Sequence, residues 1–268
     1  MKLRLAAVLG VSLLSMNGWA WGPATHAYIA SCVTESENYS VLFGSMLPDC
    51  TGIILDNATE KSQFNHMTHF EPERLATSAM ATGFKTHNGS WGGDYYAHLY
   101  YTTGAPDIWS TIKYRQLSTE FGITMQNAED VIEMCVDIQV RLLKGPSWGT
   151  LITAAANASG AAHEQAMVDA YAAELAARVS GLSVAEAEQD IRNAVQGFKM
   201  ITATFGQQLQ GSATEIRTAV LPLLATYLGC TTTVAGTYYD RGMEITADFQ
   251  TELDRACAEI KLLMPGAV

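Results

Sequence analysis

The chain contains 268 residues, of which 48% are hydrophobic and 16% are charged, and its formal net charge at pH 7 is −11. This length and composition predict one sizeable hydrophobic core. The acidity argues against tight, unspecific contacts with phosphates, so we expect no stable binding to nucleic acid. An enzyme that holds phosphate through metal ions remains compatible with it, because bound cations invert the local charge of a site.

Residues 1–20 have the pattern of a secretory signal peptide. Two basic residues precede an apolar run from Leu5 to Met16, and small residues surround the expected cleavage point after Ala20. The run is shorter than the about 20 residues of a membrane-spanning helix, and no later stretch is long and apolar enough to cross a membrane. We therefore expect an exported protein, periplasmic or secreted, whose mature chain begins at Trp21. An uncleaved membrane anchor is the alternative.

The cysteine pattern argues against a cysteine metal site, because no two cysteines have C-x-x-C spacing. In an oxidising compartment one or two disulfides are expected, and the odd number leaves at least one thiol unpaired within the chain. The sequence does not fix the pairing. The cysteines are Cys32, Cys50, Cys135, Cys230 and Cys257.

The first half of the mature chain predicts helices separated by irregular segments. A first helix is expected from Ala24 to about Leu42, before Gly44 and Pro48. The segment from Asp49 to about Phe70 is expected to be irregular. Shorter helices are expected over about 75–83 and 95–101, the second ending before a Gly-Ala-Pro sequence.

The second half has clearer helix signals. Capping-box patterns, Ser183 with Glu186 and Ser212 with Glu215, open two helices, and Pro222 is expected to kink the second. Three more helices are expected over 127–144, with Asn127 as the cap, 161–179 and 246–264. An extended conformation is compatible with residues 230–239, but the sequence offers no second strand to pair with them. The prediction is an all-α fold, one multi-helix bundle over residues 21–268.

Histidine distribution points to a site in the first half of the mature chain. Five of the six histidines lie within the first hundred residues. Zinc sites draw on histidine nitrogen and carboxylate oxygen, and in helical folds such ligands project inward from several helices. The motifs are WGPATH with His26, GSMLPDC with Asp49, NHMTHF with His66 and His69, and YYAHLYYTTGAP with His98.

Together these motifs resemble the zinc-dependent phospholipase C family (the phospholipase C/D domain), to which the zinc-dependent single-strand nucleases of fungi and plants are related. In that family the mature chain begins with a tryptophan whose amine and carbonyl bind zinc. The resemblance extends from Trp21 to Pro106 and implies an all-α fold of that type. The zinc ligands that it implies are Trp21, His26, Asp49, His69 and His98.

The chain departs from the family pattern after His98. Thr102 stands where the family has a bridging aspartate, Asp107 or Ile108 stands where it has a further histidine, and no late His-x-x-x-Glu pair exists. We therefore expect one or two zinc ions rather than three.

Asp94 and Asp107 are candidate substitute ligands. Asp94 lies one helical turn before His98 and shares its face, although a solvated acid at a helix start is an equal alternative. We expect His66 to support the site from outside the ligand set, and we expect His87 and His163 to be structural.

The resulting hypothesis is an exported, zinc-dependent phosphoric-ester hydrolase. Zinc would activate a water molecule, Asp49 would orient it or accept its proton, and the favoured substrate is phospholipid. The alternative is a non-catalytic relative, a secreted helical metal-binding or structural protein.

Overall fold

The computed structural model describes residues 21–54, 57–98 and 108–264. These residues form thirteen α-helices and two 3-10 helices without a strand, which confirms the all-α prediction. The helices of the first half are α2 (Pro23–Thr34), α3 (Tyr39–Met46), η1 (Leu47–Ile53), α4 (Ala58–Phe70), η2 (Pro72–Arg74), α5 (Ala79–His87), α6 (Gly93–His98) and α7 (Trp109–Phe121). Those of the second half are α8 (Met125–Lys144), α9 (Ser147–Ala158), α10 (Ala161–Arg178), α11 (Val184–Gln208), α12 (Ala213–Tyr227), α13 (Thr232–Ile245) and α14 (Phe249–Leu263).

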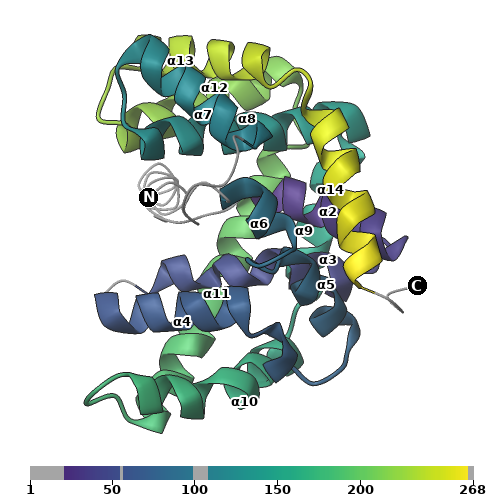
Figure 1. The fold of residues 1–268 in the computed structure, drawn as a ribbon, viewed down its shortest axis with the longest axis vertical. Coiled ribbons are helices and arrows are strands. Elements are labelled where there is room, and N and C mark those ends of the chain that lie inside the picture. The colour runs from purple at the N-terminus through teal and green to yellow at the C-terminus, as the bar shows by residue number, and fades with distance from the viewer. Residues whose placement is uncertain (1–20, 55–56, 99–107, 265–268) are drawn as a thin grey trace.

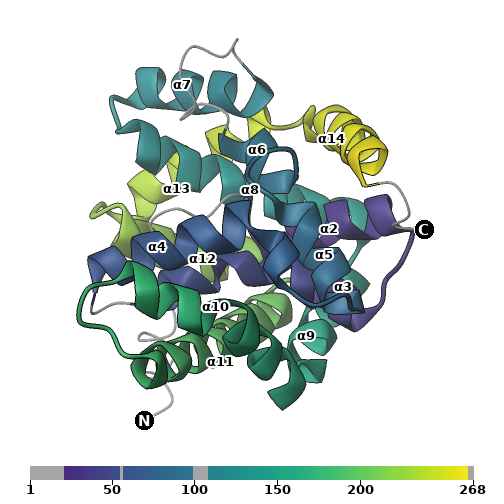
Figure 2. The ribbon, with the colours of Figure 1, turned by 60° about the horizontal axis from the view of Figure 1, so that its bottom comes forward.

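Helix α2 is packed among five other helices. It contacts α3, α5, α8, α9 and α14, and nearly all of its residues are buried, as expected for a helix without a polar face (Figure 1). Helices α7, α8, α12 and α13 gather at one end of the molecule, and α4, α10 and α11 gather at the other (Figures 1 and 2). The candidate site lies among the elements that surround α2.

The start of α2 is capped by a residue from a distant helix. Asp137 of α8 accepts hydrogen bonds from the backbone N–H groups of Thr25 at 2.8 Å and Ala24 at 3.2 Å, and from the Thr25 hydroxyl. A carboxylate is favourable there because it pairs with free N–H groups at the positive end of the helix dipole. Gly22 permits this approach, since a Cβ atom there would lie 2.3 Å from Asp137 Oδ2.

Several helices of the second half follow the sequence prediction. Both capping boxes are present, at Ser183–Glu186 before α11 and at Ser212–Glu215 before α12, and Pro222 lies inside α12. Helix α10 begins at Ala161 as expected. Helix α8 begins at Met125 rather than at residue 127, because Thr124 and not Asn127 supplies the cap.

Other predicted elements are wrong. The first helix is two helices, since the chain turns through a left-handed residue, Glu35 (φ 52°), and Asn38 caps α3. The segment expected to be irregular contains η1 and α4, and Asn57 caps α4 by accepting from the N–H groups of Thr59 and Glu60. Residues 232–239 are helical instead of extended and belong to α13, which Thr231 caps.

The remaining expected helices are shifted. Helix α5 begins after its cap, Ser78, and ends at His87, so it lies about four residues later than expected. Helix α14 occupies most of the last expected helix, and α7 and α9 were not anticipated. Of the helix expected over 95–101, the structure describes α6, while residues 99–107 lie outside the described part of the chain.

In the part of the chain that the structure describes, no single helix has both the length and the apolarity to cross a membrane. Helices α12 and α13 meet these criteria only together, and the chain bends by 113° between them.

Candidate metal centre

Four histidines and four carboxylates from six separate elements converge beside α2. They form three groups in which the potential ligand atoms lie within 4.8 Å of one another. The first two groups share His87, and the side chain of Asp94 connects them to the third. The groups are His26–Asp49–His87, His69–His87–Asp94 and His98–Glu129–Glu133.

His69 and His87 are held in the tautomer that metal ligation requires. The Nδ1 atom of His69 lies 2.8 Å from the Asn65 carbonyl oxygen, and that of His87 lies 2.9 Å from the Ser45 carbonyl oxygen. A carbonyl only accepts, so each Nδ1 must carry the proton and donate it. In the neutral ring, Nε2 is then left with its lone pair, which is the usual ligand arrangement.

These two Nε2 atoms point at the same carboxylates. They lie 3.4 Å (His69) and 3.6 Å (His87) from Asp49 Oδ1, and 3.9 and 4.0 Å from Asp94 Oδ1. Neither nitrogen forms a hydrogen bond with another described residue. The same is true of the two carboxylate oxygens of Asp49. Four polar groups therefore face one another across gaps of 3.4 to 4.0 Å, which are wide enough for an ion between them.

His26 completes the first group. Its side chain is buried, its ring stacks on His87 with the centroids 3.9 Å apart, and its Nε2 has no hydrogen-bond partner among the described residues. Burial, with a contribution from His69 and His98, lowers the pKa of His26 well below its usual value. Burial also lowers the pKa of His87. Both rings are therefore neutral at pH 7, as a metal ligand must be.

Asp49 is 1% exposed and comes from η1. Burial raises the pKa of its carboxyl to about 6, against the opposing influence of His69. A carboxylate in such surroundings requires a positive partner to stay charged.

Asp94 and His98 lie on one face of α6, as their spacing predicted. His98 Nε2 is 3.5 Å from Asp94 Oδ1, and its Nδ1 is 2.6 Å from Glu129 Oε1. Burial alone would lower the pKa of His98, but Asp94 and Glu129 outweigh it and raise the pKa to about 9. Asp94 is 6% exposed, so it is not a solvated acid at the helix start.

Helix α8 supplies the carboxylates of the third group. Glu129 and Glu133 stand one turn apart on one face of the helix, and the capping residue Asp137 follows one turn later. Both glutamates are nearly fully buried, and Glu133 Oε1 has no hydrogen-bond partner among the described residues. Burial, followed by the charge of Glu129, raises the pKa of Glu133 well above its usual value.

This donor set fits divalent cations. In the described part of the chain, Asp49 and Asp94 lie within ion-pair distance of histidines, and Glu129 pairs with His98. Isolated buried carboxylates are costly unless they are paired or coordinate a metal. Two divalent ions would balance the charge of the four carboxylates Asp49, Asp94, Glu129 and Glu133. The residues present therefore fit a metal centre of one or two ions.

The structure brings together most of the ligands expected from the sequence. His26, Asp49, His69, His98 and the proposed substitute Asp94 all belong to the cluster. The second proposed substitute, Asp107, lies outside the described residues.

Two expected residues lie apart from the three groups. Trp21 is fully buried and directly precedes Gly22, which packs against the Asp137 carboxylate. Trp21 therefore lies near the last of the three α8 acids, Glu129, Glu133 and Asp137. The role of its amine stays a prediction. His66 was expected to support the site, but its side chain is 58% exposed, lies 3.9 Å from Glu71 and stacks on Phe70. These contacts give His66 no link to the cluster.

Sequence reasoning missed His87, Glu129 and Glu133. His87 was expected to be structural, yet it belongs to two of the three groups. The acids of α8 carried a usable signal, because residues 129, 133 and 137 repeat at helical spacing within a segment that was predicted to be helical. The expectation for His163 is confirmed, since its Nδ1 accepts from the Gly160 N–H in a capping box and its Nε2 lies 3.2 Å from the Ser40 hydroxyl.

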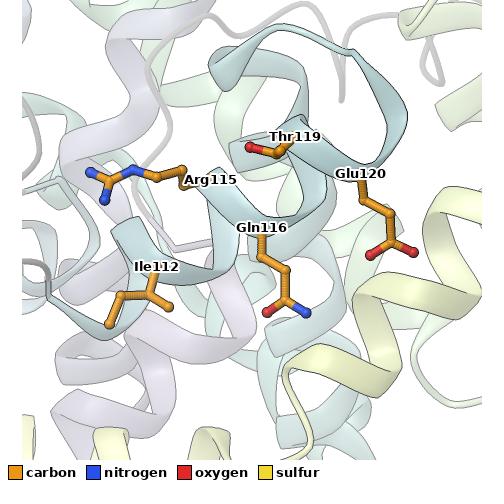
Figure 3. A pocket seen from close by; sticks show the side chains of 5 residues that line it. All are labelled: Ile112, Arg115, Gln116, Thr119 and Glu120. Carbon is orange, nitrogen blue, oxygen red and sulfur yellow. The ribbon is translucent and has the colours of Figure 1, made fainter.

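A hollow of about 480 Å³ lies away from these residues, on one face of α7 (Figure 3). Its lining contains no member of the three groups and consists of Ile112, Arg115, Gln116, Thr119 and Glu120.

Comparison of the chain with protein-family models, with curated proteins and with solved structures gives no match.

Proposed function

We propose that the protein is a metal-dependent phosphoric-ester hydrolase whose cluster beside α2 holds one or two zinc ions. The observation that carries the proposal is the fixed orientation of His69 and His87, whose Nε2 atoms both face Oδ1 of the buried Asp49. Mixed imidazole and carboxylate donors are typical of zinc. The resemblance of residues 21–106 to the zinc-dependent phospholipase C family supports the same assignment.

The donors divide into two sets. His26, Asp49, His69 and His87 would hold one ion, and His98, Glu129 and Glu133 would hold the other, with Asp94 between the two sets. Bound zinc supplies positive charge for phosphate oxygens and lowers the pKa of water towards neutrality.

The residues of the chain would contribute orientation and proton transfer. Asp49 carries two oxygens without hydrogen-bond partners among the described residues, and burial raises its pKa to about 6. With one oxygen of Asp49 on the metal, the other would be free to orient a water molecule and to accept its proton. Hydrolysis would then proceed without a covalent intermediate on the protein.

We propose phospholipid as the favoured substrate class. The net charge of −11 disfavours long, charged polymers such as nucleic acids, which contact a protein surface at many phosphates. A single phosphodiester group requires only the local positive charge of the centre.

The alternative function is a non-catalytic metal-binding or structural protein. One observation favours it, because His26, Asp49, His69, His87 and Asp94 are each at most 6% exposed, and structural zinc sites are closed while catalytic sites keep an open position.

Metal analysis and hydrolysis assays on the mature protein separate the two functions. If the protein is a hydrolase, the purified chain carries one or two zinc ions and cleaves phosphatidylcholine vesicles or a chromogenic phosphodiester, and a chelator abolishes this activity. Asp49→Asn should lower turnover by roughly 100-fold or more. The matched control Asp169→Asn changes an exposed aspartate of α10 and should leave turnover unchanged.

Each outcome decides between the functions. Bound zinc without turnover on lipid or nucleotide esters supports the metal-binding alternative. A chain that binds no divalent metal contradicts both, and preference for a single-stranded oligonucleotide over vesicles contradicts the substrate class.

A further inference from the structure

Helices α2 and α14 are joined by three contacts that follow the same order along both helices. The Tyr28 hydroxyl donates to Asp254 Oδ1 at 3.4 Å, and Lys261 pairs with Glu35 at the other end of the contact. Between them, the thiols of Cys32 and Cys257 lie in hydrogen-bond contact. The two helices are adjacent in the fold.

The spacing of these residues explains why the thiols meet. Residues 28 and 32 of α2 lie on one helix face, and Glu35 follows at the end of that helix. Residues 254, 257 and 261 share one face of α14, because three- and four-residue steps follow the helical repeat. The outer contacts align the two faces at both ends. The middle residue of each set of three is a cysteine, so the outer contacts place the two cysteines opposite each other.

We propose that Cys32 and Cys257 form a disulfide that links α2 to α14 when the protein meets a disulfide oxidant. The Cys32 thiolate attacks one sulfur of the oxidant, forms a mixed disulfide and releases one thiolate of the oxidant. Cys257 then loses its proton and attacks Cys32 Sγ, which forms the Cys32–Cys257 bond and releases the second thiolate. The two cysteines lose two protons and two electrons, and the oxidant disulfide becomes two thiols.

The surroundings assign the order of these steps. The contact with Cys257 lowers the pKa of Cys32 to about 6, and Cys32 is only partly buried. The same contact, followed by burial, raises the pKa of Cys257, which is 8% exposed. Because Cys32 is more accessible than the buried Cys257, Cys32 is the attacking thiol and Cys257 resolves the mixed disulfide.

The other cysteines lack this arrangement. Cys50 and Cys135 are fully buried, burial raises the pKa of both thiols, and Cys135 Sγ donates to the Tyr239 carbonyl at 3.6 Å. Cys230 is partly exposed and follows the end of α12. Three thiols should therefore remain after oxidation.

The link would brace the region around the candidate metal centre. Helix α14 also contacts α6 through a hydrogen bond from the Tyr96 hydroxyl to Glu259. Fixing α14 to α2 thus restrains both the helix that carries His26 and the helix that carries Asp94 and His98. The link does not depend on the metal centre, so either proposal stands if the other fails.

The test oxidises the full mature chain with glutathione disulfide and locates the link by mass spectrometry without reduction. Trypsin alone leaves Cys32 and Cys50 in one peptide, because no Lys or Arg separates them, but a glutamyl endopeptidase cuts after Glu35 and resolves them. We expect a peptide containing Cys32 joined to one containing Cys257, and three titratable thiols in denaturant. The oxidised protein should melt roughly 5–15 °C above the reduced protein.

Variants distinguish this pair from chance oxidation. Cys32→Ser and Cys257→Ala should each abolish the linked peptide and the difference in melting temperature, while Cys230→Ser should retain both. Circular dichroism of the reduced variants verifies that they fold, and if one of them does not, the other still gives the answer. Five thiols after oxidation, or a link to Cys50, Cys135 or Cys230 instead, would overturn the proposal.

Discussion

The two ring nitrogens of His87 have different roles. Nδ1 donates to the Ser45 carbonyl and fixes the ring, and Nε2 is left facing Asp49 and Asp94. His163 has no such division, because both of its nitrogens contact groups of α10 and α3 away from the cluster. This comparison separates a candidate ligand from a structural histidine in the same chain.

We expect His87→Ala to weaken zinc binding by at least about 10-fold, because even residues behind the ligands of metal sites contribute that much. His163→Ala should leave zinc binding unchanged and serves as the matched control. Titration of the metal-free proteins with zinc, followed by calorimetry, measures both affinities. Equal affinities of the two variants would show that His87 is not a ligand.

At the scale of single residues, the sequence identified those members of the cluster that lie close to recognisable motifs. His26, Asp49, His69 and His98 were predicted from their order and spacing, and all four are in the cluster. His87 was not predicted, because its neighbours in THNGSW indicate a loop, and only the packing of α5 against α2 and α3 turns its ring inward.

Among the helices, α4 and α11 are joined by an unusual pair of acids. Glu60 of α4 is 3% exposed and lines a hollow together with Asp190 of α11, and Glu186 of α11 adds a further negative charge. Among the described residues, the hollow between α4 and α11 has no other charged residue in its lining, which includes Asn57 and Asn193. Burial, followed by the charge of Asp190, raises the pKa of Glu60 to about 7.

The raised pKa of Glu60 makes the stability of this helix pair depend on pH. The folded state holds the proton more tightly than the unfolded state, so the contribution of Glu60 to stability is fully present below the unfolded pKa, near 4.5, and is lost as pH rises to about 7. Glu60→Gln keeps a neutral hydrogen-bond donor at all pH values. Thermal melts should therefore show this variant more stable than the parent at pH 8 and similar to it at pH 4.5. An equal difference at both pH values would contradict the raised pKa of Glu60.

The sequence predicted helices well where a cap and an apolar stripe agree. Ser183–Glu186 and Ser212–Glu215 open helices as expected, since each capping box precedes a periodic apolar pattern. Helix α4 was missed because it is mostly polar, and its stability comes from the Asn57 cap and from contacts with η1 and α10. Helix α13 was missed because its first residues are threonines, which favour strands unless tertiary contacts decide otherwise.

At the scale of the whole molecule, the candidate centre is assembled from residues between positions 26 and 133 on six elements. Without cations, four buried carboxylates would repel one another at the middle of the fold. Since an ion that binds only the folded state stabilises it, metal binding and global stability should be linked. The metal-free protein is expected to remain helical but to unfold at a lower temperature.

We expect zinc at 100 times its dissociation constant to stabilise the metal-free protein by about 2.7 kcal/mol. For a chain of this size, that corresponds to a rise in melting temperature of roughly 5–10 °C. The rise should vanish as pH falls towards 5, because protons compete with the metal for the histidine nitrogens. Thermal melts with zinc and with a chelator at pH 7.5 and pH 5 measure it. The Asp49→Asn protein should lose most of the rise, and the His163→Ala protein should retain it. A zinc effect that is as large in Asp49→Asn as in the parent would place the bound ion elsewhere on the molecule.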